Sequence, residues 1–320
     1  MSKVFEPGRY QDVPEDVYHQ SAGISKSMLS KMDCPVKLLA PPKPPTPAMI
    51  VGSAVHHAIL EPDKFNKLYA KPLQLPTDIQ VVDTVAEMKD ILKQMGIKAT
   101  GAKAALMDTL KAADGSLIFL SDLKAEQESA NIGKIVITDE AYDKALRMRD
   151  SVHSHPQASE LLGMCKHFEE SHYWIDERTG ELCKARTDAF ASDNCIIDLK
   201  KVANASPWGF SKALWDYKYH WQDAWYSRGT KADNFFFICV EDDGPSFVTE
   251  VYCLTERDKC QGQREVDAAL DKYMVCRDLD DWPSYNDNDR INMIELPRYA
   301  QVGGITGAYY EEKEKSNSNF

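Results

Sequence analysis

The chain has 320 residues, of which 43% are hydrophobic, so it can build a sizeable core as one large domain or two modest ones. Its formal net charge of -12 excludes a protein that coats nucleic acid by bulk attraction, because phosphate binding draws on clustered Lys and Arg; a local basic channel remains compatible with that charge. No apolar run approaches the roughly eighteen residues of a membrane span, and the first twenty residues lack a signal-peptide core, so we expect a cytoplasmic protein.

The eight cysteines are scattered singly, without a CxxC pair. This pattern predicts reduced, mostly buried thiols. Cys253, Cys260 and Cys276 match no zinc or iron-sulfur spacing, so we expect no cysteine metal site.

The first third of the chain is predicted to be helical. Apolar spacing predicts a helix within residues 21–40, the proline-rich residues 41–49 should form an extended link, and a buried helix follows until Glu61-Pro62. That second helix carries His56 and His57.

Residues 83–114, "DTVAEMKDILKQMGIKATGAKAALMDTLKAAD", predict a helix, a short extended linker and a second helix. The segment resembles the SAP-like helix-extended-helix motif, a small DNA-binding fold. The resemblance makes Lys98, Lys103 and Lys111 candidate phosphate contacts. The alternative is an amphipathic helical hairpin that serves as a linker.

Residues 115–160 are predicted to be helical again, with a break at Pro156 next to His153 and His155, which we expect to be structural or at the surface. From Phe168 the hydrophobic period changes to two, and breaks at 178–180 and 192–194 indicate a three-stranded meander. One long helix is predicted over 206–230, with its four tryptophans in the core: Trp208, Trp215, Trp221 and Trp225.

Two more strands (234–241 and 246–255), a closing helix (256–279) and a polar disordered tail complete the predicted order. This order predicts an α/β or α+β layered fold with a central mixed sheet flanked by helices. No glycine-rich phosphate loop occurs in the sequence, so nucleotide-dependent chemistry is not indicated.

Two aspartates of the meander are predicted to face each other. With a turn centred on Asp193, the residue numbers of paired residues sum to 386, which sets Asp188 opposite Asp198. Facing like charges destabilise a strand pair by up to about 1 kcal/mol, and a divalent cation reverses the sign of that effect. Carboxylates and carbonyl oxygens are the ligands that Mg²⁺ or Mn²⁺ prefers.

Lys200 lies two residues after Asp198, so both side chains leave the strand on the same face, while the backbone carbonyl of Leu199 stays available as a ligand. An ammonium beside metal-bound carboxylates can orient water and stabilise phosphoryl charge. The alternative is an exposed hairpin with incidental ion pairs among Lys184, Arg186, Asp188 and Lys200.

The run "TD" followed by "IIDLKK" resembles the core of PD-(D/E)XK nucleases. In addition, "GSAVHHAILEP" resembles the helix that bears the motif histidine in RecB-like members, and "QDAWY" fits their Q-x-x-x-Y motif. With "YHQSAGISKSMLS", "GELCKARTDAF" and "YHWQDAWYSRG", residues 18–280 resemble the RecE-type exonuclease of prophage recombination systems.

The resemblance implies a restriction-endonuclease-like domain over 1–302 with an insertion at 83–114 and a disordered tail at 303–320. The roles it implies are as follows: Asp188 and Asp198 bind the metal; Lys200 and His56 join them in catalysis; Gln222 and Tyr226 contact substrate. Glu170 is a further candidate ligand, with Glu169 competing for that role. Lys184, Arg186 and Lys103 are candidate DNA contacts.

The implied activity is a Mg²⁺-dependent exonuclease, with Mn²⁺ as the other metal considered, that degrades linear double-stranded DNA from 5′ to 3′ and leaves a 3′ single strand for an annealing partner. The resemblance also implies a ring-like homo-oligomer, whose channel would be lined by Lys184, Arg186, Lys200 and Lys201. The alternatives are an endonuclease or single-strand-specific enzyme of the same superfamily, and a DNA-binding protein that keeps the fold as a scaffold.

Overall fold

The structure is a computed structural model that describes residues 3–191, 194–242, 246–285, 291 and 293–295. The chain divides into a larger unit, residues 1–30 with 42–270, and a smaller unit, residues 31–41 with 271–320. The predicted turn centre Asp193 and the predicted tail at 303–320 lie outside the described residues. Among the described helices, none has the length and apolarity to cross a bilayer.

A mixed sheet forms the centre of the larger unit, as the alternating pattern predicts. Its order is β1-β7-β8-β9-β10-β11, with β2 paired to β8. β9 and β10 are parallel, β2 and β8 are parallel, and the other pairs are antiparallel. The strands are β1 (Gly8–Tyr10), β2 (Ile24–Ser25), β7 (Cys165–Ile175), β8 (Leu182–Ala191), β9 (Cys195–Val202), β10 (Asn234–Glu241) and β11 (Thr249–Tyr252).

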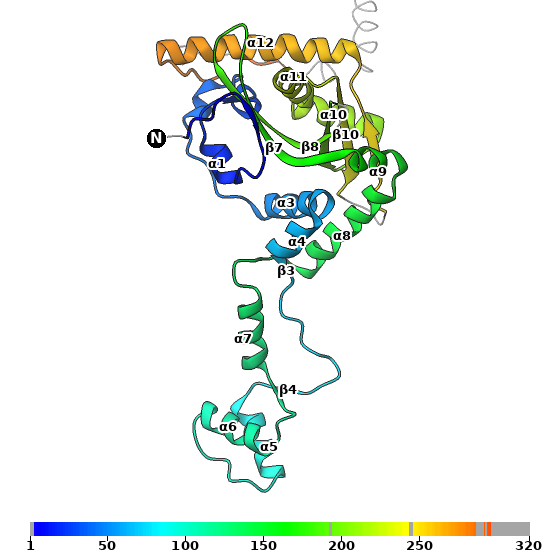
Figure 1. Cartoon of the computed structure of the whole chain (residues 1–320). Coiled ribbons are helices and arrows are strands. Elements are labelled where there is room, and N and C mark those ends of the chain that lie inside the picture. Colours follow the sequence, from blue (N-terminus) through cyan, green and yellow to red (C-terminus); the bar gives the residue numbers. More distant parts are fainter. Residues whose placement is uncertain (1–2, 192–193, 243–245, 286–290, 292, 296–320) are drawn as a thin grey trace, which may run out of the picture. The chain divides into compact units, whose positions relative to one another are not determined.

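Helices cover both faces of this sheet (Figure 1). Side chains alternate along a strand, so Leu199 and Ile197 pack with one helix layer, while Ile196 and Phe190 pack with the other. The first layer contains α3 (Pro47–Leu60), α4 (Pro62–Leu68), α8 (Asp139–Ser154) and α9 (Pro156–Gly163). The second contains α10 (Pro207–Asp216) and α11 (Tyr219–Thr230).

The single helix predicted over 206–230 is two helices. Ser206 caps α10 by accepting a hydrogen bond from the Gly209 N–H (3.2 Å), and Pro207 takes the first turn, as the sequence predicts. Lys218 then adopts a left-handed conformation (φ 54°) that separates α10 from α11. Lysine lacks the sequence signature of such a break, which glycine or asparagine would have provided.

The prediction for the four tryptophans is correct for two of them. Trp221 and Trp225 are buried, with 7% and 0% exposed. Trp208 and Trp215 on α10 are 76% and 62% exposed, so the expectation that they belong to the core is wrong. α10 turns its opposite face, with Phe210, toward the sheet.

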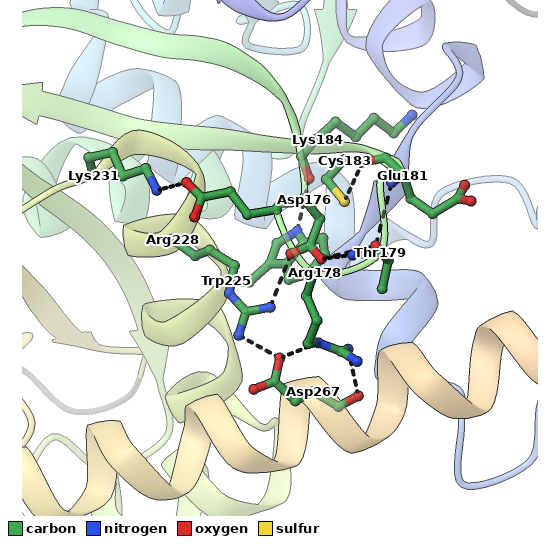
Figure 2. A network of polar contacts seen from close by, with 11 residues as sticks. Asp176, Arg178, Thr179, Glu181, Cys183, Lys184, Trp225, Arg228, Lys231 and Asp267 are labelled. Carbon is green, nitrogen blue, oxygen red and sulfur yellow. Dashed lines mark hydrogen bonds and ion pairs between the residues drawn. The ribbon is translucent and has the colours of Figure 1, made fainter.

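The tip of the β7–β8 hairpin is fixed by a polar network (Figure 2). Asp176 accepts hydrogen bonds from the N–H and hydroxyl of Thr179 (3.0 and 2.9 Å). Arg228 of α11 lies 3.4 Å from the Asp176 carboxylate and donates to Asp267 at 2.8 Å. Asp267 belongs to α12 (Glu256–Leu279), so the network ties the hairpin to two helices and holds its register.

The segment between β3 (Tyr69–Ala70) and β6 (Ile135–Val136), which pair in parallel, has a core of its own. α5 (Val85–Gln94) and α6 (Lys103–Ala113) pack together, and β4 (Val81–Val82) pairs with β5 (Ile118–Phe119), before α7 (Leu120–Ala130). Met88, Leu92, Leu106, Leu110 and Phe119 are at most 1% exposed and form that core. The two helices predicted within 83–114 are therefore present in a compact unit that spans residues 81–119.

The remaining elements are short. In the larger unit α1 (Glu15–Gln20) lies between β1 and β2 in the chain, and α2 (Lys26–Leu29) follows β2 directly. In the smaller unit the 3-10 helix η1 (Pro35–Leu38) is held by a hydrogen bond from the Val36 N–H to the Pro283 carbonyl (3.1 Å).

Candidate metal and catalytic site

The two aspartates sit where strands β8 and β9 stop pairing. Their ladder pairs Ala189 with Ile197 and Ala191 with Cys195, so the predicted sum of 386 is confirmed, and its continuation sets Asp188 against Asp198. The Leu199 N–H donates a hydrogen bond to Asp188 Oδ2 (2.8 Å). The Asp188 carboxylate thus takes a hydrogen bond from the β9 backbone just past the last residue pair of the ladder.

Glu169 joins this position from β7. The β7–β8 ladder pairs Phe168 with Ala189 and Glu170 with Thr187, which leaves Glu169 facing Asp188. Glu169 has a left-handed backbone (φ 51°), an irregularity that is uncommon for a non-glycine residue in a strand. Such local irregularities often occur at functional sites, where they re-aim a side chain.

His56 reaches the same place from α3, with its Nδ1 3.8 Å from Asp188 Oδ2. One ligand atom each from His56, Glu169 and Asp188 lies within 4.8 Å of the others. Carboxylates are ligands of hard divalent cations, and a neutral imidazole is a common ligand of divalent transition metals. The residues present therefore fit a divalent cation.

Glu170 does not belong to this cluster. Adjacent strand residues point to opposite faces, and Glu170 is 2% exposed with its Oε1 3.0 Å from His172 Nε2. The structure therefore does not support Glu170 as a ligand and places Glu169 there instead. A turn centred on Thr179 would pair residues whose numbers sum to 358 and would set Glu170 against Asp188. The observed pairs sum to 357, and this difference of one residue sets Glu169 there instead.

Asp198 is fully buried next to this cluster. The Lys200 ammonium lies 2.5 Å from its Oδ2, and the Gln222 amide donates to its Oδ1. Its Oδ2 has no hydrogen-bond partner among the described residues apart from this ion pair, so that oxygen keeps lone-pair capacity for a cation. Leu199 lines the adjacent cavity, and a ligand role for its carbonyl stays a prediction.

Burial raises the pKa of each carboxyl group in the site, and the Asp188 charge adds to this effect at Glu169 and Asp198. Burial, and then the Asp188 charge, raise the pKa of Glu169 to about 8. Burial raises the pKa of Asp198 to about 6, against the opposing effect of Lys200, and burial also raises the pKa of Asp188. Burial and the Lys200 charge lower the pKa of His56 to about 4, so its imidazole is neutral at pH 7 and able to bind a metal.

A cavity of about 800 Å³ opens beside the cluster. His56, Glu169, Leu199 and Lys200 line it, together with Tyr219. Further lining side chains are cationic: Lys64, Arg186 and Lys201. The cavity can therefore admit a phosphodiester next to the candidate metal ligands.

Three expected substrate contacts have other partners. The Lys184 ammonium is buried and donates to the carbonyls of Tyr18 (2.8 Å) and Ser21 (2.7 Å), so the structure does not support it as a DNA contact or channel residue. Arg186 lines the cavity, but its Nε lies 3.1 Å from Glu169 Oε2, which orients that carboxylate. Lys103 lies 3.0 Å from Asp83.

Gln222 and Tyr226 share one face of α11, as their spacing predicts, but neither lines the cavity. Gln222 is 8% exposed and holds Asp198, while the Tyr226 ring packs on the sheet, with its centroid 6.4 Å from that of Phe235. Burial raises the pKa of Tyr226 well above its usual value. In this structure Gln222 is thus a positioning residue for Asp198.

Comparison with known proteins identifies the family of the chain. Residues 25–295 match the family model described as a PDDEXK-like domain of unknown function (DUF3799). No curated protein matches the chain. Among solved structures, a candidate exonuclease from Eubacterium rectale is similar, with 14% identity, a TM-score of 0.40, and coverage of 77% of this chain and 97% of that one. A second, SSO0001, has 13% identity, a TM-score of 0.25, and coverage of 70% and 86%.

The family match spans most of the described residues, including the candidate metal ligands and the lysine beside them: His56, Glu169, Asp188, Asp198 and Lys200. The fold, with a mixed central sheet between two helix layers, is the one that such a domain requires. The chain therefore belongs to the PDDEXK-like DUF3799 family.

Proposed function

We propose that this protein is a metal-dependent deoxyribonuclease that hydrolyses phosphodiester bonds. The observation that carries the proposal is the cluster of His56, Glu169 and Asp188, with one ligand atom each within 4.8 Å of the others, beside the buried pair of Asp198 and Lys200. Burial raises the pKa of all three carboxyl groups, and the Asp188 charge also raises the pKa of Glu169 and of Asp198. Clustered, perturbed groups in a cavity favour a functional site.

His56, Glu169, Asp188 and Asp198 would hold the cation, with Mg²⁺ as the proposed metal and Mn²⁺ as its substitute. A bound divalent cation supplies Lewis-acid polarisation of a phosphoryl oxygen and lowers the pKa of water. Lys200 is placed to orient the attacking water and to stabilise charge on the phosphoryl oxygens, because its ammonium is fixed beside Asp198 at the cavity wall. Arg186 and Gln222 hold the Glu169 and Asp198 carboxylates in place.

Beyond this chemistry, we propose the RecE-type activity that the sequence motifs imply. The enzyme would degrade linear duplex DNA from 5′ to 3′ and leave a 3′ single strand for an annealing protein. A ring-like homo-oligomer would suit this activity, because a ring can combine an acidic outer surface with a central channel that is lined by basic residues and binds DNA. The support for these finer statements is the set of motifs in residues 18–280.

The test uses end-labelled linear duplex and closed circular duplex, with Mg²⁺ or EDTA, beside Asp198→Ala. Release of mononucleotides from linear DNA alone, lost with EDTA and with the substitution, is the expected result. Cleavage of the closed circular duplex would show that the enzyme is an endonuclease and not an exonuclease, because a closed circle has no ends. Intact DNA that is retarded on a gel would show a binding protein without catalysis, and labelling either the 5′ or the 3′ end decides the polarity.

A further inference from the structure

α10 and the turn after it expose three large aromatic side chains to solvent. Trp208, Trp215 and Tyr217 are 76%, 62% and 64% exposed. A single exposed aromatic residue is ordinary, but exposed rings that stack on buried or half-buried rings beside a catalytic cavity favour a binding surface. We call Trp215, Tyr217 and Tyr219 the aromatic platform.

The two exposed rings of this platform each stack on another ring of the protein. The Trp215 ring lies nearly parallel to His220, with an interplanar angle of 7° and centroids 5.8 Å apart. His220 is buried, and its Nε2 lies 2.7 Å from Glu265 Oε2. The Tyr217 ring stacks on Tyr219 with centroids 5.6 Å apart. Each exposed ring is therefore supported on one side, which lowers the entropy cost of stacking a ligand on it.

The platform is continuous with the catalytic centre. Tyr219 lines the cavity, and the Lys200 ammonium lies 4.7 Å from the centroid of its ring. From Lys200, the series Tyr219 and Tyr217 leads outward to the protein surface. A strand whose phosphodiester lies at Lys200 would meet these rings with its neighbouring nucleotides.

Positive charge accompanies the rings. The Lys26 ammonium donates to the Tyr217 carbonyl (2.9 Å), and the Lys218 ammonium lies 4.1 Å from the centroid of the Trp221 ring. Burial, and then the charges of Lys200 and Lys218, lower the pKa of Lys26 to about 8. Lys26 and Lys218 thus place two ammonium groups beside the rings of a chain with a net charge of -12, and local positive charge of this kind suits a polyanion.

We propose that the aromatic platform, with Lys26 and Lys218, binds an unpaired stretch of the DNA strand next to the scissile bond, with bases stacked on the rings and phosphates near the ammonium groups. Paired bases in a duplex would not offer their faces to these rings, whereas unpaired bases do. A protein partner would explain the exposed rings but not their continuity with the catalytic cavity through Tyr219. The inference rests on the proposed nuclease function for its substrate class, but binding is measurable without cleavage.

The test measures binding of the full chain to labelled single-stranded oligothymidylate in EDTA, and to an abasic strand of the same length. Wild-type protein should bind the thymidylate at least about tenfold more tightly, because stacking contributes about 1–3 kcal/mol per base. Trp215→Leu and Tyr217→Leu should remove that preference, while Trp215→Phe and Tyr217→Phe retain most of it. Lys26→Met and Lys218→Met should weaken binding of both strands, and Ile175→Ala, another exposed apolar residue, should change neither.

Equal binding of the two strands by wild-type protein would overturn the proposal. So would equal effects of the Leu and Phe variants, which would show that apolar area matters rather than the ring. Self-association lost in Trp215→Leu, with unchanged oligonucleotide binding, would assign the surface to a second copy of the chain. If the protein prefers the thymidylate strand but cleaves no DNA, the binding role of the platform is supported and the nuclease proposal fails. If it cleaves DNA without that preference, the nuclease proposal is supported and the binding role of the platform fails.

Discussion

At the residue scale, Asp188 combines two roles that can be separated by one substitution. Its Oδ2 accepts a hydrogen bond from the Leu199 N–H, and its charge repels Glu169 and Asp198. Asp188→Asn keeps an acceptor and removes the charge. We therefore expect a metal-free variant at least as stable as the wild type, because the repulsion is reduced.

Added Mg²⁺ should raise the melting temperature of the wild type by about 5 °C when the metal is at about one hundred times its Kd, and it should not do so for Asp188→Asn. The measurement is thermal unfolding in EDTA and in Mg²⁺. Asp216→Asn, which alters an exposed carboxylate paired with Lys212, is the matched control and should keep the full metal shift. A metal shift that survives in Asp188→Asn would remove Asp188 from the ligand set.

Substitutions of the adjacent residues Glu169 and Glu170 should have different effects, the first on metal binding and catalysis and the second on stability. Glu169→Gln should weaken Mg²⁺ binding at least about tenfold and lower kcat about a hundredfold, since Glu169 belongs to the cluster. Glu170→Gln should keep the metal dependence and lower stability by about 1–3 kcal/mol, because Glu170 is buried against His172. Metal titration of activity and denaturant unfolding separate the two outcomes, and the reverse assignment would restore Glu170 as the ligand.

The raised carboxyl pKa values predict an unusual pH dependence for the metal-free protein. Glu169 titrates near 8 and Asp198 near 6 in the folded state, both above their ordinary values near 4. Between pH 4 and 8 the folded state then binds more protons than the unfolded state, so stability falls as pH rises. Unfolding in EDTA should show this fall, and Glu169→Gln should reduce it above pH 6. A stability in EDTA that does not fall between pH 5 and 8 would contradict the raised carboxyl pKa values of the site.

At the scale of elements, strand β9 distinguishes two neighbouring lysines. Lys200 points toward Asp198 and the Tyr219 ring, while Lys201 forms an ion pair with Asp242. Lys200→Met should lower kcat at least about a hundredfold and leave the Mg²⁺-induced melting shift in place. Lys201→Met should lower kcat less than about fivefold. Similar losses in both variants would mean that bulk positive charge in the cavity, rather than the position of Lys200, supports the reaction.

The same strands show why the sequence predicts some of the site and misses the rest. The register of β8 and β9 follows from side-chain alternation around a short turn, which local patterning encodes. The ladder of β7 shifts between Cys165 and His167, and Glu169 adopts a left-handed backbone, features that depend on tertiary packing. The break at Lys218 and the exposure of Trp208 and Trp215 are likewise set by how α10 and α11 pack on the sheet.

At the scale of the whole molecule, the compact unit at 81–119 is separable from the catalytic fold. Its core residues pack with one another, and β3 and β6 pair at the point where the chain leaves and returns. The Ile137 N–H also donates a hydrogen bond to the Ala70 carbonyl (3.0 Å), so the two ends of the segment between β3 and β6 are held together within the catalytic fold. Replacing residues 73–132 with a short glycine-serine link should therefore lower the melting temperature by less than about 5 °C, because closing a shorter loop costs little.

That deletion also tests whether the compact unit binds DNA. Lys103 and Lys111 are paired with Asp83 and Asp122, so a phosphate contact there must compete with an existing ion pair. If the SAP-like resemblance reflects function, the deletion should weaken binding to long duplex DNA at least about threefold and should lower the processivity of degradation. The rate of cleavage of a short duplex should not change. Matched variants Lys103→Met and Lys98→Met should reproduce part of the loss with a smaller salt dependence of binding. Unaltered affinity and processivity would leave the unit as a helical linker that is held together by its own apolar core.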